Sequence, residues 1–170
     1  YKGSSYNAYL VRGNNKTALI DTVWQPFDKE FVTNLKKEID LHSIDYIIMN
    51  HNEIDHSGSL PELMREIPDT PIYCTAKGEG IIRGHYHKDW NFVNVKTGDN
   101  LDLGGVMLTF IEASMLHWPD TMFTYMNGGD GEHILFSDDG FVQHYASESL
   151  FDDCVDKHEV YHEAMKYYAN

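Results

Sequence analysis

The stretch Asn50-His51-Asn52-Glu53-Ile54-Asp55-His56-Ser57-Gly58 decides how the rest of this 170-residue chain is interpreted. Its two imidazoles and two carboxylates fall within six positions, and groups this close repel one another or compete for protons unless a cation binds them. The alternative interpretation is a polar, solvated turn. Because the stretch offers more donors than one ion usually takes from a single loop, it favours a metal centre, and a binuclear one.

The apolar run in front of this stretch, residues 46–49, predicts a buried strand whose end carries the ligands. Two further candidate ligands also follow apolar strands, namely His117 and Asp139. A lone His after a strand is more often a hydrogen-bonding group of the surface or core, but the first motif needs partners. Asp138 and Asp139 cannot be separated by chemistry alone, and either carboxylate would offset the repulsion between two bridged cations.

The order of the expected elements predicts the fold class. Strands come in runs with helices between the runs, which favours an α/β or α+β fold with two mixed β-sheets flanked by helices. The expected strands are residues 5–11, 17–20, 46–49, 71–75, 92–95, 101–103, 106–111, 122–126 and 133–136. The expected helices begin at Asp28 and Ser59 as caps, cover residues 77–87, and take up most of residues 147–170.

Composition narrows the class of protein. Hydrophobic residues make up 42% and charged residues 24%, as in an ordinary globular domain, and we expect residues 1–170 to form one domain. A net charge of -14 argues against a nucleic-acid-binding surface. Cys74 and Cys154 are far apart and form no CxxC pair, which favours a reducing, cytoplasmic compartment. No apolar run approaches the length of a membrane span.

Three motifs together resemble the flavodiiron proteins, and the similarity runs across nearly the whole chain. They are the first motif, the loop Met115-Leu116-His117-Trp118-Pro119-Asp120, and the segment Leu135-Phe136-Ser137-Asp138-Asp139-Gly140. Glu53 makes the resemblance specific, because related zinc hydrolases of the metallo-β-lactamase superfamily have a second His there. A carboxylate adds negative charge and a hard oxygen donor, which suits iron cycling between +2 and +3 better than hydrolytic zinc.

The resemblance implies a ligand set and a fold. It implies His51, Glu53 and His117 on the iron nearer the flavin, and Asp55 and His56 on the farther iron. Asp139 would bridge the two irons, and Trp118 is either a core plug or a contact on the FMN side. The implied fold is the αββα metallo-β-lactamase-like sandwich.

The resemblance also implies an activity and partners. In such proteins FMN lies on a flavodoxin domain of the partner subunit in a head-to-tail homodimer or tetramer, and a rubredoxin-type donor supplies electrons. The di-iron site reduces nitric oxide to nitrous oxide, or oxygen to water, and the ligand set is the same for either gas. The alternatives are a zinc-dependent hydrolase of the metallo-β-lactamase superfamily, and an inactive fragment that binds no metal.

The chain departs from the family pattern at its ends and in one motif. The family's last ligand, a His on the farther iron, is expected beyond residue 170, as are the flavodoxin and rubredoxin domains, and the N-terminus is expected to be cut. Asp138-Asp139-Gly140 stands where the family usually has Asn-Asp-Ala. We therefore expect a di-iron domain that is incomplete at both ends.

Overall fold

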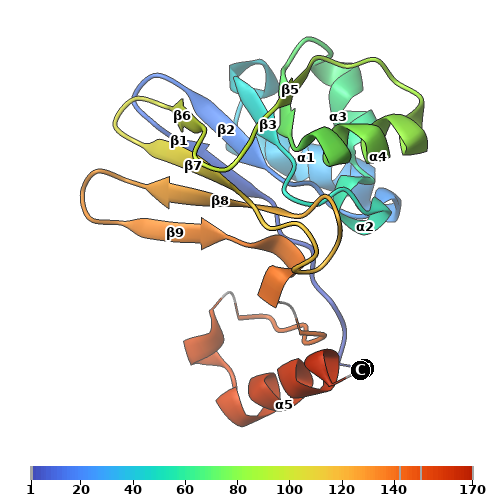
Figure 1. Ribbon diagram of the computed structural model, residues 1–170, viewed down its shortest axis with the longest axis vertical. Coiled ribbons are helices and arrows are strands. Elements are labelled where there is room, and N and C mark those ends of the chain that lie inside the picture. The colour runs from blue at the N-terminus through green and yellow to red at the C-terminus, as the bar shows by residue number, and fades with distance from the viewer. Residues whose placement is uncertain (1, 142, 150, 170) are drawn as a thin grey trace.

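The computed structural model describes residues 2–141, 143–149 and 151–169, and its body is two β-sheets packed face to face (Figure 1). The first sheet has the strand order β1-β2-β3-β4-β5. The β1–β2 pair is antiparallel and the other pairs are parallel, so this sheet is mixed as predicted. Its strands are β1 (Tyr9–Arg12), β2 (Thr17–Ile20), β3 (Tyr46–Ile48), β4 (Ile72–Cys74) and β5 (Phe92–Asn94).

The second sheet has the order β6-β7-β8-β9, and all its pairs are antiparallel. It is a meander, which explains why the sequence places four strands in a row without a helix between them. Its strands are β6 (Asn100–Asp102), β7 (Met107–Glu112), β8 (Met122–Asn127) and β9 (His133–Phe136).

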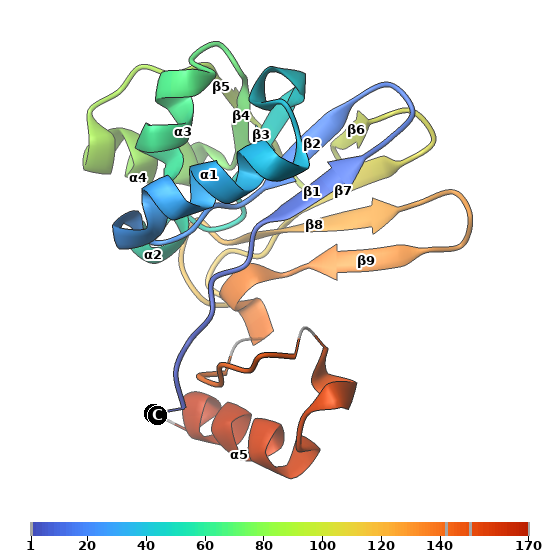
Figure 2. The same ribbon diagram turned by 180° about the vertical axis from the view of Figure 1, so that it is seen from behind.

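Helices cover the outer face of the first sheet (Figure 2). The covering helices are α1 (Asp28–Glu38), α3 (Leu60–Glu66) and α4 (Ala76–Tyr86), whereas α2 (Ile54–Ser57) is a single turn at the end of β3. The last helix, α5 (Lys157–Tyr168), lies beyond one edge of the sandwich in both views. The α/β sandwich is therefore confirmed, and within the described residues its helical layer lies on the first sheet.

Alternation along β3 divides the core into two layers. Ile47 points into the cluster between the first sheet and the helices, where it packs with residues such as Leu63. Ile48 points into the cluster between the two sheets, where it packs with residues such as Phe110. Both isoleucines are fully buried, so β3 is a central strand whose C-terminal end is fixed from both faces.

Some predicted boundaries differ from the structure. The first strand covers Tyr9–Arg12 rather than residues 5–11. The predicted helical range 147–170 contains a helix over Lys157–Tyr168, and residues 150 and 170 lie outside the described residues. Ser59 precedes α3 but makes no side-chain capping bond, and its hydroxyl is buried without a hydrogen-bond partner among the described residues. Asp28 is the first residue of α1 rather than its cap.

A buried polar network ties the ends of β2 and β3 to the second sheet. The Asp21 carboxylate accepts hydrogen bonds from the backbone and side-chain N–H groups of Asn50, at 2.7 and 3.0 Å. Thr124 in β8 donates to the side-chain oxygen of Asn50 at 2.7 Å. Asp21 has φ 58°, a left-handed conformation that aims its carboxylate across the strand ends. This network fixes the point from which the first motif leaves the sheet.

Candidate metal centre

The first motif lies in the loop after β3 and in the one-turn helix α2. Backbone N–H groups of His56 and Ser57 donate to the Glu53 carbonyl, which closes the turn. The Ser57 hydroxyl also contacts the Asn52 and Glu53 carbonyls and the Tyr86 hydroxyl of α4. These bonds curl the segment so that side chains that are adjacent in sequence face one volume.

Three segments that are distant in sequence meet at one edge of the sandwich. The β3–α2 loop, the loop between β7 and β8 and the 3-10 helix Asp138–Phe141 after β9 all come together near α2 (Figure 1). The loop between β7 and β8 brings His117, and the short helix brings Asp139. The structure therefore brings His117 and Asp139 close to the first motif.

The nitrogen atoms Nε2 of three histidines face carboxylates at this edge. His51 Nε2 lies 3.5 Å from Glu53 Oε2. Asp139 lies between the other two, with Oδ1 3.3 Å from His56 Nε2 and Oδ2 3.4 Å from His117 Nε2. A single carboxylate thus offers one oxygen to each half of the cluster, which is the placement that a bridging ligand requires.

The donors form two adjoining groups. In each group, one ligand atom per residue lies within 4.8 Å of the others. The groups are His51, Glu53 and His117, and His56, Asp138 and Asp139. Asp55 lies beside the second group, with Oδ2 3.5 Å from His56 Nε2.

Several of these donor atoms are buried without any hydrogen bond. His51 Nε2, His117 Nε2 and Asp55 Oδ1 have no hydrogen-bond partner among the described residues. A buried polar atom without a partner is costly, so its retention needs an explanation. Imidazole nitrogens and carboxylate oxygens that converge in this way fit cations, and the two groups fit two of them.

The charge balance of the cluster points the same way. Burial acts to lower the pKa of His56, but the carboxylates of Asp138 and Asp139 outweigh it and raise the pKa to about 11. Burial acts to raise the pKa of Asp139, and His56 reverses that shift. Positive charge beside these carboxylates is therefore stabilising, and either a proton on His56 or a bound metal can supply it. Metal binding would displace the proton.

Two residues behind the histidines were not predicted from the sequence. Asp120, which is 1% exposed, accepts hydrogen bonds from the backbone and side-chain N–H groups of Asn52, and its Oδ2 lies 3.4 Å from His51 Nδ1. The Tyr167 hydroxyl, from α5, lies 2.9 Å from His117 Nδ1. Asp120 stands in the quoted His117 motif, but nothing in the spacing shows that it faces His51.

Trp118 lies beside the cluster and is not a buried core residue. Its ring centroid is 6.2 Å from that of His51 and 6.3 Å from that of His117, and 45% of the residue is exposed. Its neighbours Met115 and Leu116 are more exposed still, at 71% and 61%. The loop that carries His117 therefore presents an apolar surface directly above the candidate metal centre.

Gly140, which follows the two aspartates, is explained by its neighbour Phe123. A Cβ at Gly140 would lie 2.5 Å from the edge of the Phe123 ring, closer than real carbon atoms approach. A larger residue at position 140 would therefore require the Phe123 ring to move. The close approach packs the turn with Asp138 and Asp139 against β8.

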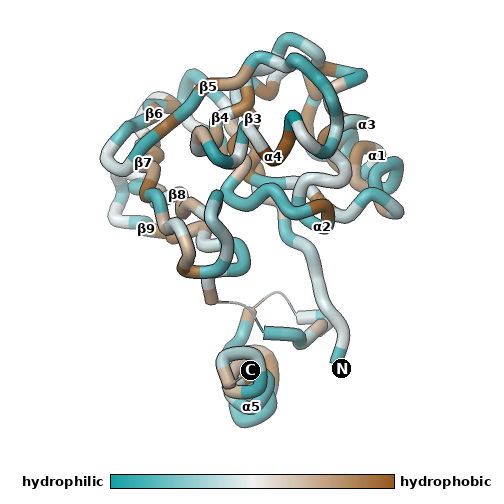
Figure 3. Tube along the Cα trace, turned by 45° about the vertical axis from the view of Figure 1, so that its right-hand side comes forward, coloured by the Kyte–Doolittle hydropathy of each residue, from teal (hydrophilic) through white to brown (hydrophobic). Residues whose placement is uncertain are grey.

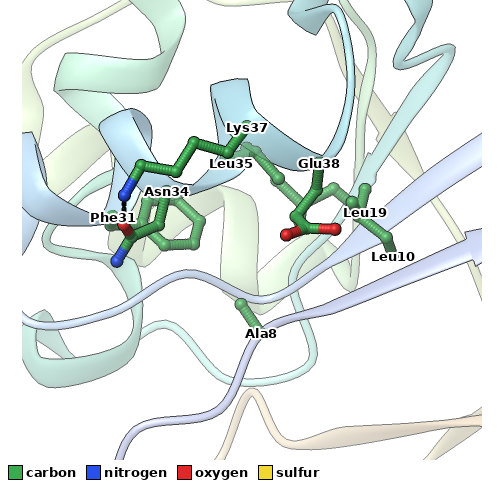
Figure 4. Close-up of a pocket in the computed structure, with 8 residues that line it drawn as sticks. All are labelled: Ala8, Leu10, Leu19, Phe31, Asn34, Leu35, Lys37 and Glu38. Atoms are coloured by element: carbon green, nitrogen blue, oxygen red, sulfur yellow. Dashed lines mark hydrogen bonds between the residues drawn. The ribbon is translucent and has the colours of Figure 1, made fainter.

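A groove between β1 and α1 is larger than the cavity beside His56, but it lacks the groups that a metal site or a catalytic site needs (Figure 4). Its volume is about 530 Å³, and the residues that line it are Ala8, Leu10, Leu19, Phe31, Asn34, Leu35, Lys37 and Glu38. At its rim, Lys37 donates a hydrogen bond to the Asn34 side chain at 2.8 Å. Figure 3 shows that hydrophobic positions gather mainly in the strands and helices of the body. We therefore place the functional site at the histidine cluster.

Comparison with known proteins shows what this chain is similar to. A model of the ODP family of β-lactamases matches residues 5–169. The anaerobic nitric oxide reductase flavorubredoxin of Salmonella paratyphi B is 57% identical over 99% of this chain, which spans 35% of that relative's length. The rubredoxin oxygen:oxidoreductase of Desulfovibrio gigas is 38% identical with a TM-score of 0.91. The flavodiiron protein of Giardia intestinalis is 35% identical with a TM-score of 0.91, and in each structure the match covers 99% of this chain and 41% of the other.

Proposed function

The chain belongs to the ODP family of β-lactamases, and we propose that it forms the non-haem di-iron core of a flavodiiron oxidoreductase. We propose that residues 1–170 belong to one metallo-β-lactamase-like di-iron domain. The substrate would be nitric oxide, reduced to nitrous oxide, or oxygen, reduced to water. The observation that carries the proposal is Asp139, whose two oxygens lie within 3.4 Å of the Nε2 atoms of His56 and His117.

Each candidate ligand has a proposed role. His51, Glu53 and His117 would hold the iron nearer the flavin, and Asp55 and His56 the farther iron. Asp139 would bridge the two. The support is that the first three donors form one compact group and that His56 and Asp139 belong to the adjoining one.

The bound irons would supply the redox chemistry, in which two nitric oxide molecules, two electrons and two protons give nitrous oxide and water. The chain's own part is to aim three Nε2 atoms at one volume and to hold the bridging carboxylate between them. Asp120 holds the loop of the first motif through Asn52, so the ligands are set in place by buried bonds. Such fixed geometry is what open coordination positions require.

The electron supply would come from outside this chain. We propose FMN on a flavodoxin domain, presented across a head-to-tail homodimer or tetramer, with a rubredoxin-type donor. The exposed apolar loop at Met115, Leu116 and Trp118 supports this, because it offers apolar side chains next to His117 against which a flavin-bearing domain can dock. The names of the Salmonella and Desulfovibrio relatives, a flavorubredoxin and a rubredoxin oxygen:oxidoreductase, also support it.

The proposed location is the cytoplasm. Cys74 and Cys154 are both free thiols, which a reducing compartment keeps in that state. No helix in the described part of the chain is long and apolar enough to cross a membrane.

Glu53→His is the experiment that separates iron chemistry from zinc hydrolysis. Replacing the carboxylate with an imidazole removes a hard oxygen donor and a negative charge, so the site should favour zinc more. We expect the ratio of iron to zinc in protein grown with both metals to fall by about tenfold or more. Mass spectrometry of the purified protein measures this ratio.

Glu132→His is the matched control, because Glu132 is exposed in the β8–β9 turn, at the end of the second sheet that lies far from α2 (Figure 1). It should leave the ratio unchanged. Full iron loading and full activity in Glu53→His would refute the argument from ligand hardness. Turnover of a thioester by the zinc-loaded wild type would instead favour a hydrolase.

A further inference from the structure

The two consecutive carboxylates Asp138 and Asp139 lie on opposite sides of the His56 ring. Asp139 Oδ1 is 3.3 Å from Nε2, the nitrogen that faces the other candidate ligands. Asp138 Oδ1 is 3.0 Å from Nδ1, on the far side. The side chains of His56 and Asp138 are 6% and 7% exposed, so this contact is shielded from solvent.

The geometry of imidazole separates the roles of the two aspartates. Its nitrogens point in different directions, so a group at Nδ1 does not share an ion that is bound at Nε2. Asp55 also lies on the Nε2 side, 3.5 Å away, which identifies that side as the metal side. Nδ1 has no aligned hydrogen-bond partner among the described residues, and Asp138 is the acceptor that the structure places within reach of it.

The backbone explains how neighbouring residues reach opposite sides. Asp138 has φ 45°, in the left-handed region that Asp tolerates better than most residues. The 3-10 helix Asp138–Phe141 starts at this residue, and the next residue, Asp139, turns toward His117. The turn therefore aims one carboxylate behind His56 and the other between His56 and His117.

The same arrangement recurs at the other two histidines. His51 presents Nε2 to Glu53 and Nδ1 to Asp120, at 3.5 and 3.4 Å. His117 presents Nε2 to Asp139 and Nδ1 to the Tyr167 hydroxyl. In proteins, a histidine that binds a metal through one nitrogen usually donates the other N–H to an acceptor that fixes the ring.

We propose that Asp138 is a positioning residue and not a metal ligand: it accepts the Nδ1–H of His56 and so holds Nε2 toward the farther metal. This inference rests on the proposed di-iron site. Behind His56 the acceptor is a carboxylate, and behind His117 it is a phenol. Compared with the phenol behind His117, the carboxylate would make His56 a more basic ligand than His117. It would thereby favour the more oxidised state of a metal bound at Nε2 of His56.

Two substitutions in the full-length protein distinguish a positioning residue from a ligand. Asp138→Asn keeps an oxygen that can accept the Nδ1–H, and Asp138→Ala removes it. A cavity of about 180 Å³ lined by Asp21, His56 and Asp138 adjoins the position, so water can enter the space that Ala leaves. For zinc at the farther site, we expect an affinity loss of about 10- to 100-fold in Asp138→Ala and a smaller loss in Asp138→Asn. Competition with a chromophoric chelator measures both.

The tautomer of His56 gives a readout that mere loss of structure would not produce. In zinc-loaded wild-type protein, long-range proton–nitrogen NMR should show His56 protonated at Nδ1 and metal-bound at Nε2. Asp138→Asn should keep this tautomer and shift the Nδ1–H resonance. Loss of the farther zinc in Asp138→Asn, or zinc at Nδ1 of His56, would overturn the inference while leaving the di-iron proposal intact. A wild type that binds no metal would instead overturn the proposed function.

Discussion

If the proposed function holds, Asp139→Ala in the full-length protein is expected to lower the rate of nitric oxide reduction by at least about a thousandfold, because this carboxylate would bridge the two metals. Its oxygens lie 3.3 and 3.4 Å from the Nε2 atoms of His56 and His117. Without it, two bound cations would face each other with no anion between them, and each would lose a donor. We expect metal content to fall below two ions per chain, with the farther ion lost first.

Asp69→Ala is the control for this variant. Asp69 is an exposed carboxylate in the turn between α3 and β4, so its removal changes the net charge by the same amount as that of Asp139. Its metal content and activity should match the wild type. If Asp139→Ala kept two metals and turned over nitric oxide at the normal rate, Asp139 would not be the bridge.

Asp120→Ala is expected to destabilise the fold by about 3 kcal/mol and to weaken metal binding at the nearer site about 10- to 100-fold. The first effect arises because the backbone N–H and the side-chain amide of Asn52 both lose their buried acceptor. The second arises because His51 Nδ1 loses the carboxylate 3.4 Å behind it. Denaturant unfolding of the metal-free protein measures the first effect, and chelator competition measures the second.

Asp130→Ala is the matched control, because Asp130 also accepts a backbone N–H, that of Glu132, but at the exposed tip of the β8–β9 hairpin. It should change the free energy of unfolding by a few tenths of a kcal/mol. Asp120→Asn retains one acceptor oxygen, so its loss in free energy of unfolding should lie between those of Asp120→Ala and Asp130→Ala. If Asp120→Ala had the same denaturant midpoint of unfolding as the wild type, the hydrogen bonds from Asn52 to Asp120 would not be what holds the loop.

The parts of the site that follow from local sequence could be predicted. His51, Glu53, Asp55 and His56 are close in the chain, so a single turn after β3 brings them together whatever the remaining fold does. His117 and Asp139 could be placed because each follows an apolar strand, and in a sandwich these strand ends reach one edge.

The remaining features depend on side-chain direction or on distant packing. Asp138 and Asp139 differ in role because Asp138 has φ 45°, and no sequence pattern reports that angle. Tyr167 reaches His117 from α5, fifty positions along the chain. Ser59 looks like a helix cap, but it is buried before α3 and makes no capping bond, so packing overrode the local preference. The lack of space for a side chain at Gly140 follows from its contact with Phe123, which the sequence does not show.

The most direct test of the account is the metal content per chain of the protein purified anaerobically, with no metal added. Two adjoining groups of donors, with Asp139 within 3.4 Å of a histidine from each, predict two irons per chain, measured by mass spectrometry. One iron would mean that the nearer group, His51, Glu53 and His117, binds alone and that the centre is not binuclear. Two zincs would favour a hydrolase, and a folded chain without metal would contradict the account altogether.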